Sequence, residues 1–302
     1  MANTKEIKRI IESNKSNIAF IIGNGINRYP NNPKALSWDD LLMELWNKIS
    51  FQTLSKKPQG ISITEFYDIL ELENTGNYNL QKEVVKLLRS WEPQTHHKQI
   101  SDYIKSINAP LLTTNFEETF AKTGNYKLYR IEEEKGFTDF YPWTSYHGDN
   151  QLELPTDGFG IWYINGMINY HRSIRLGLSH YMGSVERTRG LLHKGNEDSL
   201  FSGKNVGHWP GSKSWLHIVF NKSLFIFGIG LEENEIFLRW LLIERTKYFR
   251  KFPDRKQKGW YLTPKYSNDI DLGKKFFLEK VGIEVLEVDC FDDIYGKIWT
   301  KS

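Results

Sequence analysis

The sequence contains a single cysteine, Cys290, so no disulfide can form within one chain and no thiolate cluster is available for a structural zinc. No apolar run approaches the roughly 18 residues that a membrane helix needs, and the N-terminus lacks the charged-then-apolar layout of a signal peptide. The net charge is only +3 in 302 residues, which gives no ground to expect a nucleic-acid-binding protein. We therefore expect a cytoplasmic protein with no metal, no membrane and no nucleic acid among its partners.

The composition is that of a globular protein, with 39% hydrophobic and 14% aromatic residues. Short apolar runs alternate with stretches of helical spacing, and this alternation favours a parallel sheet with right-handed crossovers. The predicted fold is α/β, a Rossmann-like, mostly parallel sheet flanked by helices. We predict strands at residues 17–22, 111–114, 127–131, 160–164, 223–227, 260–263 and 283–288.

The whole chain, residues 1–302, is predicted to form one domain that contains a helical insertion at about 52–108. Three segments in that region show helical spacing without a convincing strand between them. Further along, residues 186–215 are rich in Gly, His, Lys and Ser and predict a long loop or lid.

Two strand ends in the first half of the chain have features of a nucleotide site. Gly23-Asn24-Gly25-Ile26-Asn27 directly follows the first strand, and glycines there let the backbone approach a phosphate. Thr113-Thr114-Asn115 ends the second strand with two hydroxyls and an amide. Because the carboxyl ends of parallel strands lie at one edge of a sheet, we expect both segments to converge on one ligand. The alternatives are an ordinary turn and a helix cap at Asn115.

Two later strands end in a similar way. Asn165-Gly166 follows strand 160–164, although Asn-Gly is also a common signal for a tight turn. Gly228-Ile229-Gly230-Leu231-Glu232 follows strand 223–227. An acid in that place can bond a ribose hydroxyl or simply favour the start of a helix.

The order of these four segments resembles the SIR2-like family, bacterial relatives of sirtuins that act as effectors in anti-phage defence. In that family Ser-Trp begins the helix after the first glycine loop, as Ser37-Trp38 do here. A strand that ends in Thr-Asn-aromatic-acid is matched by Thr114-Asn115-Phe116-Glu117, and a Gly-x-Gly turn followed by acids lies nearer the C-terminus. The resemblance spans residues 18 to about 245.

The resemblance implies an NAD pocket and the hydrolysis of NAD to nicotinamide and ADP-ribose. Asn115 and Asn165 would be the catalytic residues beside the nicotinamide ribose. It also implies a homo-oligomer, with a partner ATPase or another defence protein. The absence of the zinc-binding cysteines of true sirtuins argues against a protein deacylase. The NAD-binding residues implied in this way are Gly23, Asn24, Gly25, Ile26, Asn27, Thr114, Glu117, Gly166, Gly228, Gly230 and Glu232.

One position departs from the family pattern, because Asn165 stands where the family has histidine. An amide has no basic lone pair with which to take a proton, and losing a general base typically costs ~10²–10⁴-fold in rate. Three other histidines, His147, His171 and His180, are expected to be solvated loop residues. The sequence therefore leaves a second function open, that of a non-catalytic NAD- or ADP-ribose-binding regulatory or assembly subunit.

A basic segment near the C-terminus is a weaker candidate for binding nucleic acid or an acidic partner. Cations at the end of a helix are usually solvated, and we expect that role here. The segment contains Arg245, Lys247, Arg250, Lys251, Arg255, Lys256 and Lys258.

Overall fold

The computed structural model describes residues 3–131, 141–194, 198–203, 208–265 and 270–300. Its described strands form one eight-stranded sheet in the order β3-β4-β5-β2-β1-β6-β7-β8. The six strands from β5 to β8 in that order run parallel, whereas β4 is antiparallel to both of its neighbours. The predicted α/β class is confirmed. The strands are β1 (Ile18–Ile22), β2 (Leu111–Thr113), β3 (Lys127–Arg130), β4 (Ser145–Gly148), β5 (Ile161–Tyr163), β6 (Ser223–Phe227), β7 (Gly259–Pro264) and β8 (Glu284–Val288).

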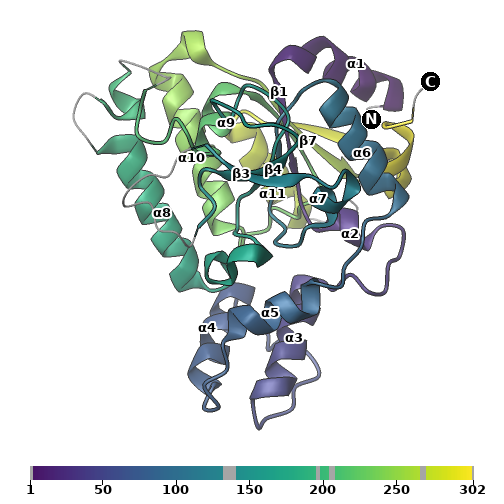
Figure 1. Cartoon of the computed structure of the whole chain (residues 1–302), viewed down its shortest axis with the longest axis vertical. Coiled ribbons are helices and arrows are strands. Elements are labelled where there is room, and N and C mark those ends of the chain that lie inside the picture. Colours follow the sequence, from purple (N-terminus) through teal and green to yellow (C-terminus); the bar gives the residue numbers. More distant parts are fainter. Residues whose placement is uncertain (1–2, 132–140, 195–197, 204–207, 266–269, 301–302) are drawn as a thin grey trace.

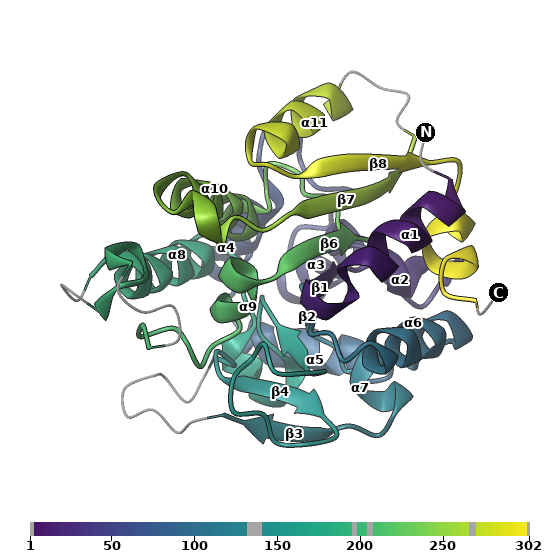
Figure 2. The ribbon, with the colours of Figure 1, turned by 90° about the horizontal axis from the view of Figure 1, so that it is seen from above.

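Helices cover both faces of this sheet. Figure 2 shows α1 and α6 on one side and α8, α9 and α10 on the other. The central strands β1 and β6 are buried along their whole length, which explains their continuous apolar sequences. The described helices are α1 (Thr4–Asn14), α2 (Gly25–Arg28), α3 (Trp38–Ile49), α4 (Ile63–Glu73), α5 (Leu80–Leu88), α6 (Thr95–Ser106), α7 (Thr119–Thr123), α8 (Leu178–His193), α9 (Leu216–Asn221), α10 (Ile236–Lys251) and α11 (Ile270–Lys280), with shorter turns η1 (Lys15–Asn17), η2 (Ile168–Ser173), η4 (Leu200–Ser202), η5 (Pro253–Arg255) and η6 (Asp293–Lys297).

A separate helical cluster projects from the edge of the sheet domain (Figure 1). It consists of α3, α4 and α5, whose apolar faces share a core of their own that includes Leu45, Phe66 and Val84. Helix α6 instead contributes Ile100 and Ile104 to the core on one sheet face. The cluster therefore begins earlier and ends earlier than the expected insertion at about 52–108.

The loop or lid predicted at 186–215 is wrong for residues 186–193, which belong to α8, whereas the described residues after them form turns and a short 3-10 helix. Helix α8 continues to His193 because it buries a face at helical spacing, which includes Tyr181, Thr188 and Leu192. Its glycines lower helix propensity, but tertiary burial outweighs that effect. Trp209 and Trp215 are also buried in the main core, so this part of the segment is anchored. Residues 195–197 and 204–207 of the predicted lid lie outside the described residues.

Strand β4 was not predicted, because only four residues form it and all of them are buried. Tyr146 pairs with Trp162 of β5, and their rings stack at 4.6 Å. These contacts join segments that lie far apart in the sequence, so local periodicity does not reveal them. None of the described helices combines the length and the apolar character required to cross a bilayer.

Candidate functional site

The carboxyl ends of three neighbouring strands lie together at one edge of the sheet. Ile22 at the end of β1 pairs with Thr113 of β2 and with Phe227 of β6. The next residues continue the register, since Gly23 N donates to Phe227 O at 3.1 Å and Thr114 N donates to Ile22 O at 3.2 Å. The expectation that the first glycine loop and the Thr114-Asn115 segment share one edge is therefore confirmed.

The two glycine turns interlock. Gly25 N donates to Gly228 O at 2.8 Å, and Gly228 has a φ of +71°. A Cβ on Gly23 would lie 2.6 Å from the Cβ of Ile229, and a Cβ on Gly25 would clash with the Tyr295 hydroxyl. Glycine is thus required here by the close approach of two turns, whether or not a phosphate lies against them.

Asn27 links the first loop to the second strand end. Its Nδ2 donates to Glu117 Oε1 at 2.6 Å and to Asn24 Oδ1 at 3.0 Å. His97 Nδ1 accepts from the Gln94 amide, so Nε2 carries the proton and donates to Asn27 Oδ1 at 3.0 Å. Burial lowers the pKa of His97 to about 3, so the ring is neutral and this tautomer is fixed. The contacts hold the Asn27 amide in one orientation.

Glu117 is buried at the centre of this network, at 3% exposure. Burial raises the pKa of its carboxyl, and the hydrogen bonds from Asn27 and Thr119 oppose that rise. Thr119 N donates to Glu117 Oε2 at 3.1 Å, and the Thr119 hydroxyl lies 2.9 Å from the same oxygen. The network positions the loops around it, because each of its members comes from a different turn or helix.

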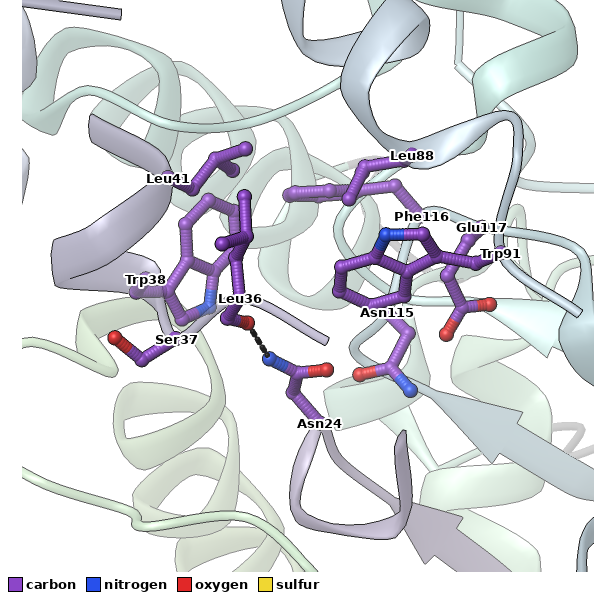
Figure 3. Close-up of a pocket in the computed structure, with 10 residues that line it drawn as sticks. All are labelled: Asn24, Leu36, Ser37, Trp38, Leu41, Leu88, Trp91, Asn115, Phe116 and Glu117. Carbon is purple, nitrogen blue, oxygen red and sulfur yellow. Dashed lines mark hydrogen bonds between the residues drawn. The ribbon is translucent and has the colours of Figure 1, made fainter. Parts of the chain in front are cut away.

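Asn24 and Asn115 face each other across a small cavity (Figure 3). Asn24 Nδ2 donates to Leu36 O at 2.9 Å, which ties the glycine loop to the segment before α3. The Asn115 amide is buried, and its contact with Glu117 is one of those that oppose the rise in the Glu117 pKa. The cavity has a volume of about 20 Å³, room for about one water molecule. Trp38, Phe116 and several other apolar side chains line its far side.

A much larger cavity of about 480 Å³ opens beside it, within the range of small-molecule sites. Asn24, Gly25 and Thr114 line it together with Gly228, Gly230 and Glu232 of the second glycine turn. Three of the four strand ends predicted from the sequence, those after β1, β2 and β6, therefore contribute residues to one cavity. The remaining lining residues are Arg28, Ser37, Trp38, Ile229, Glu235, Tyr261, Leu262, Thr263, Pro264, Lys274, Phe291, Ile294 and Tyr295.

Arg28 is the exposed cation of this cavity's glycine-loop wall, and it also lines a neighbouring cavity of about 690 Å³. In the sequence, Arg28 stands at the position where a dinucleotide fingerprint has its third glycine, so the pattern alone does not mark it as a ligand-binding cation. The backbone amides of Gly23 and Gly25 already donate to the chain. Arg28 therefore supplies charge that those two amides do not offer to an anionic ligand.

Two carboxyl groups on the second glycine turn have different environments. Glu232 forms an ion pair with the buried Lys274 at 2.8 Å. Glu235 is half-buried, and burial together with the nearby charge of Glu232 raises its pKa to about 7. Glu235 was missed in the sequence, where it is the last residue of a run of polar residues before an apolar helix. Its place directly before α10 was the available signal.

Asn165 lies at the end of β5, and its side chain contacts the backbone of Thr114. Its Nδ2 donates to Thr114 O at 3.3 Å, and its carbonyl accepts from Arg175 N at 2.9 Å. Gly166 follows with a φ of +97°, as the predicted tight turn requires. Neither Asn165 nor Gly166 belongs to the lining of the three cavities described above. Gly23, Ile26, Asn27, Asn115 and Glu117 are likewise absent from the lining of the large cavity, and of these Asn115 and Glu117 line the small one.

The expectation of solvated loop histidines is wrong for His147 and His180. His147 is a buried residue of β4, 3.4 Å from Glu118, and it pairs with Ile161 at the other end of β5 from Asn165. His180 lies in the first turn of α8, where burial lowers its pKa to about 4 and its Nδ1 accepts from the Gly177 amide at 3.4 Å. Both side chains are used by the fold, and burial also lowers the pKa of His171.

The basic segment makes many of its contacts within the chain. Arg245 is buried and donates to carbonyls that include Val219 O at 2.8 Å and Lys258 O at 3.0 Å. Lys247 pairs with Glu244 at 2.7 Å. The expected solvated role is therefore wrong for Arg245, which is buried and donates to backbone carbonyls, whereas Lys247 pairs at the surface.

Among the described residues, no group of three or more His, Cys, Asp or Glu side chains is arranged to hold a metal ion. No model of a known protein family matches the chain, and no curated protein matches it either.

Proposed function

We propose that this protein is an NAD glycohydrolase of the SIR2-like type, which releases nicotinamide and ADP-ribose. One observation carries the proposal: two glycine turns and Thr114 line one cavity of about 480 Å³, and Asn115 lines the small cavity beside it. That volume lies within the roughly 300–1,000 Å³ of ligand sites. Arg28 would face the diphosphate, and Glu232 of the second glycine turn would contact a ribose hydroxyl.

The chemistry breaks the bond between nicotinamide nitrogen and the ribose C1′ through an oxocarbenium-like state. Asn115 is suited to orient the ribose or the attacking water, because its buried amide lines the small cavity that lies against the large one. The carboxyl of Glu117, which the Asn115 side chain helps to keep ionised, holds that amide in place. Positioning within a site walled by buried side chains would supply much of the acceleration.

The test is the release of nicotinamide from NAD by the purified chain, followed for several hours. Asn115→Ala should lower the rate at least tenfold, whereas Asn150→Ala, which removes an exposed amide away from the cavity, should leave it unchanged. Equal rates for the two variants would contradict the assignment of Asn115. If the wild-type chain neither binds NAD in calorimetry nor releases nicotinamide, the proposed function fails.

A second function, NAD or ADP-ribose binding without turnover, is favoured by one observation. Asn165, which replaces the family histidine, is buried and cannot act as a base. Tight binding of either ligand without nicotinamide release would support this function. If only the Asn165→His variant releases nicotinamide, the chain is a binding protein that retains the architecture of a hydrolase and lacks its base.

The roles in anti-phage defence and in a homo-oligomer, with a partner ATPase or another defence protein, stay predictions from the resemblance. Light scattering of the purified chain tests the oligomer, and plaque formation on cells that express it tests the defence role.

A further inference from the structure

Glu235 occupies a distinct place in the large cavity. It ends the second glycine turn directly before α10, and it lines the same cavity as Asn24 and Thr114. Thr114 is the residue whose carbonyl accepts from Asn165. Glu235 therefore lines the cavity that receives the ends of β1, β2 and β6.

The surroundings of Glu235 connect it to the end of β5 as well. Burial raises the pKa of Tyr181 in α8, and the charge of Glu235 raises it further, so the two side chains are neighbours. Tyr181 and Tyr141 both lie beside Arg175, whose guanidinium is 4.9 Å from the centre of the Tyr141 ring. Arg175 N donates to Asn165 O at 2.9 Å. This chain of contacts leads from the Glu235 side of the cavity to Asn165, where the SIR2-like family has its histidine.

The charges around Glu235 leave its carboxyl free for chemistry. Glu232 on the same turn is engaged by Lys274 of α11 at 2.8 Å. Arg239 of α10 donates to Leu231 O at 2.9 Å, and Tyr261 of β7 donates to Ile229 O at 2.7 Å. Within the described residues, Glu235 itself forms no ion pair. It is a partly desolvated carboxyl on a residue that lines a ligand-sized cavity.

We propose that Glu235 is the general base of this site and takes the part that Asn165 cannot fill. The inference rests on the proposed NAD glycohydrolase function. The bond between C1′ and the pyridinium nitrogen breaks, and its electron pair leaves on nicotinamide, which becomes neutral. The oxygen of water forms the new bond to C1′, one proton of that water passes to the Glu235 carboxylate, and the carboxyl then releases the proton to solvent.

The experiment measures kcat for nicotinamide release by the full chain from pH 5 to pH 9, with calorimetric binding of NAD and ADP-ribose in parallel. The wild-type rate should rise about tenfold per pH unit below about 7 and then level off, because burial raises the pKa of Glu235 to about 7 and only the ionised form accepts a proton. Glu235→Gln should lower kcat by about 10²–10⁴-fold and abolish this rise while ligand binding is kept. Glu235→Asp should recover part of the rate.

Glu233→Gln is the matched control, since it removes an exposed carboxyl two residues away that does not line the cavity. Its rate and pH profile should equal those of the wild type. A Glu235→Gln rate within threefold of the wild type overturns the role of Glu235 and leaves the glycohydrolase function standing. NAD binding by the wild type without hydrolysis at any pH also overturns it, in favour of the binding function. Absence of both binding and hydrolysis defeats the proposed function itself.

Discussion

Replacing Glu235 with Gln should stabilise the protein at alkaline pH, and this test needs no ligand. The folded protein raises the pKa of Glu235 from 4.5 to about 7, mainly through burial. The folded state therefore holds the proton more tightly than the unfolded chain does. The favourable contribution is complete below pH 4.5, decreases as the pH rises and is lost above about pH 7, where the folded protein contains a poorly hydrated carboxylate.

The size of the effect follows from the pKa difference. A shift of one pKa unit corresponds to about 1.4 kcal/mol, so the full difference is about 3 kcal/mol. Because Glu235 is half-buried and part of its charge is screened by water, we expect about 1–3 kcal/mol. Glutamine has nearly the shape of the protonated acid. Glu235→Gln should therefore gain this stability at pH 8 and gain almost none at pH 4.5.

Urea unfolding followed by tryptophan fluorescence measures the difference at both pH values. Glu233→Gln removes the same formal charge from an exposed neighbour and should change stability by less than about 0.5 kcal/mol at either pH. The reasoning is refuted if Glu235→Gln is no more stable than the wild type at pH 8, or if its gain is the same at both pH values.

Two further substitutions test the packing around the cavity. Asn27→Ala should lower the free energy of unfolding by about 2–4 kcal/mol in urea, because Glu117 and His97 each lose a buried hydrogen-bond partner; a loss below 1 kcal/mol would show that the network can rearrange. Gly25→Ala should cost about 1–3 kcal/mol and weaken NAD binding in calorimetry, because its Cβ clashes with the Tyr295 hydroxyl. Adding Tyr295→Phe should restore part of that stability, and no recovery would place the strain at the neighbouring backbone.

The strands at the centre of the sheet could be predicted because a strand buried on both faces has a run of consecutive apolar residues. Strand β1 is apolar along its whole length and β6 is apolar after Ser223, and the polar or glycine residues that follow both strands mark the ligand edge. Because parallel strands share that edge, the meeting of Asn24 with Asn115 followed from local patterns alone.

Other features depend on contacts that no local pattern contains. Strand β4 is defined by the packing of Tyr146 on Trp162, and α8 by the burial of Thr188 and Leu192 against the core. Glu232 and Glu235 differ in their charge environment because Lys274 forms an ion pair with Glu232 and not with Glu235. Lys274 lies 42 positions after Glu232 in the sequence. The sequence alone cannot distinguish these two acids, because both are glutamates in the same short acidic run.

The interlocked glycine turns change the interpretation of the glycines and thereby the expected source of ligand affinity. In the sequence, Gly23 and Gly25 favoured close approach of a diphosphate to free backbone amides. In the structure both amides donate to carbonyls of the β6 end, so those two donors are already used. The backbone then acts as a rigid floor, and side chains must provide recognition. Arg28 is the cation placed for that on the glycine-loop wall, and Glu235 is the unpaired carboxyl placed across the same cavity. In the proposed function, binding charge and proton transfer would therefore come from separate groups on different turns.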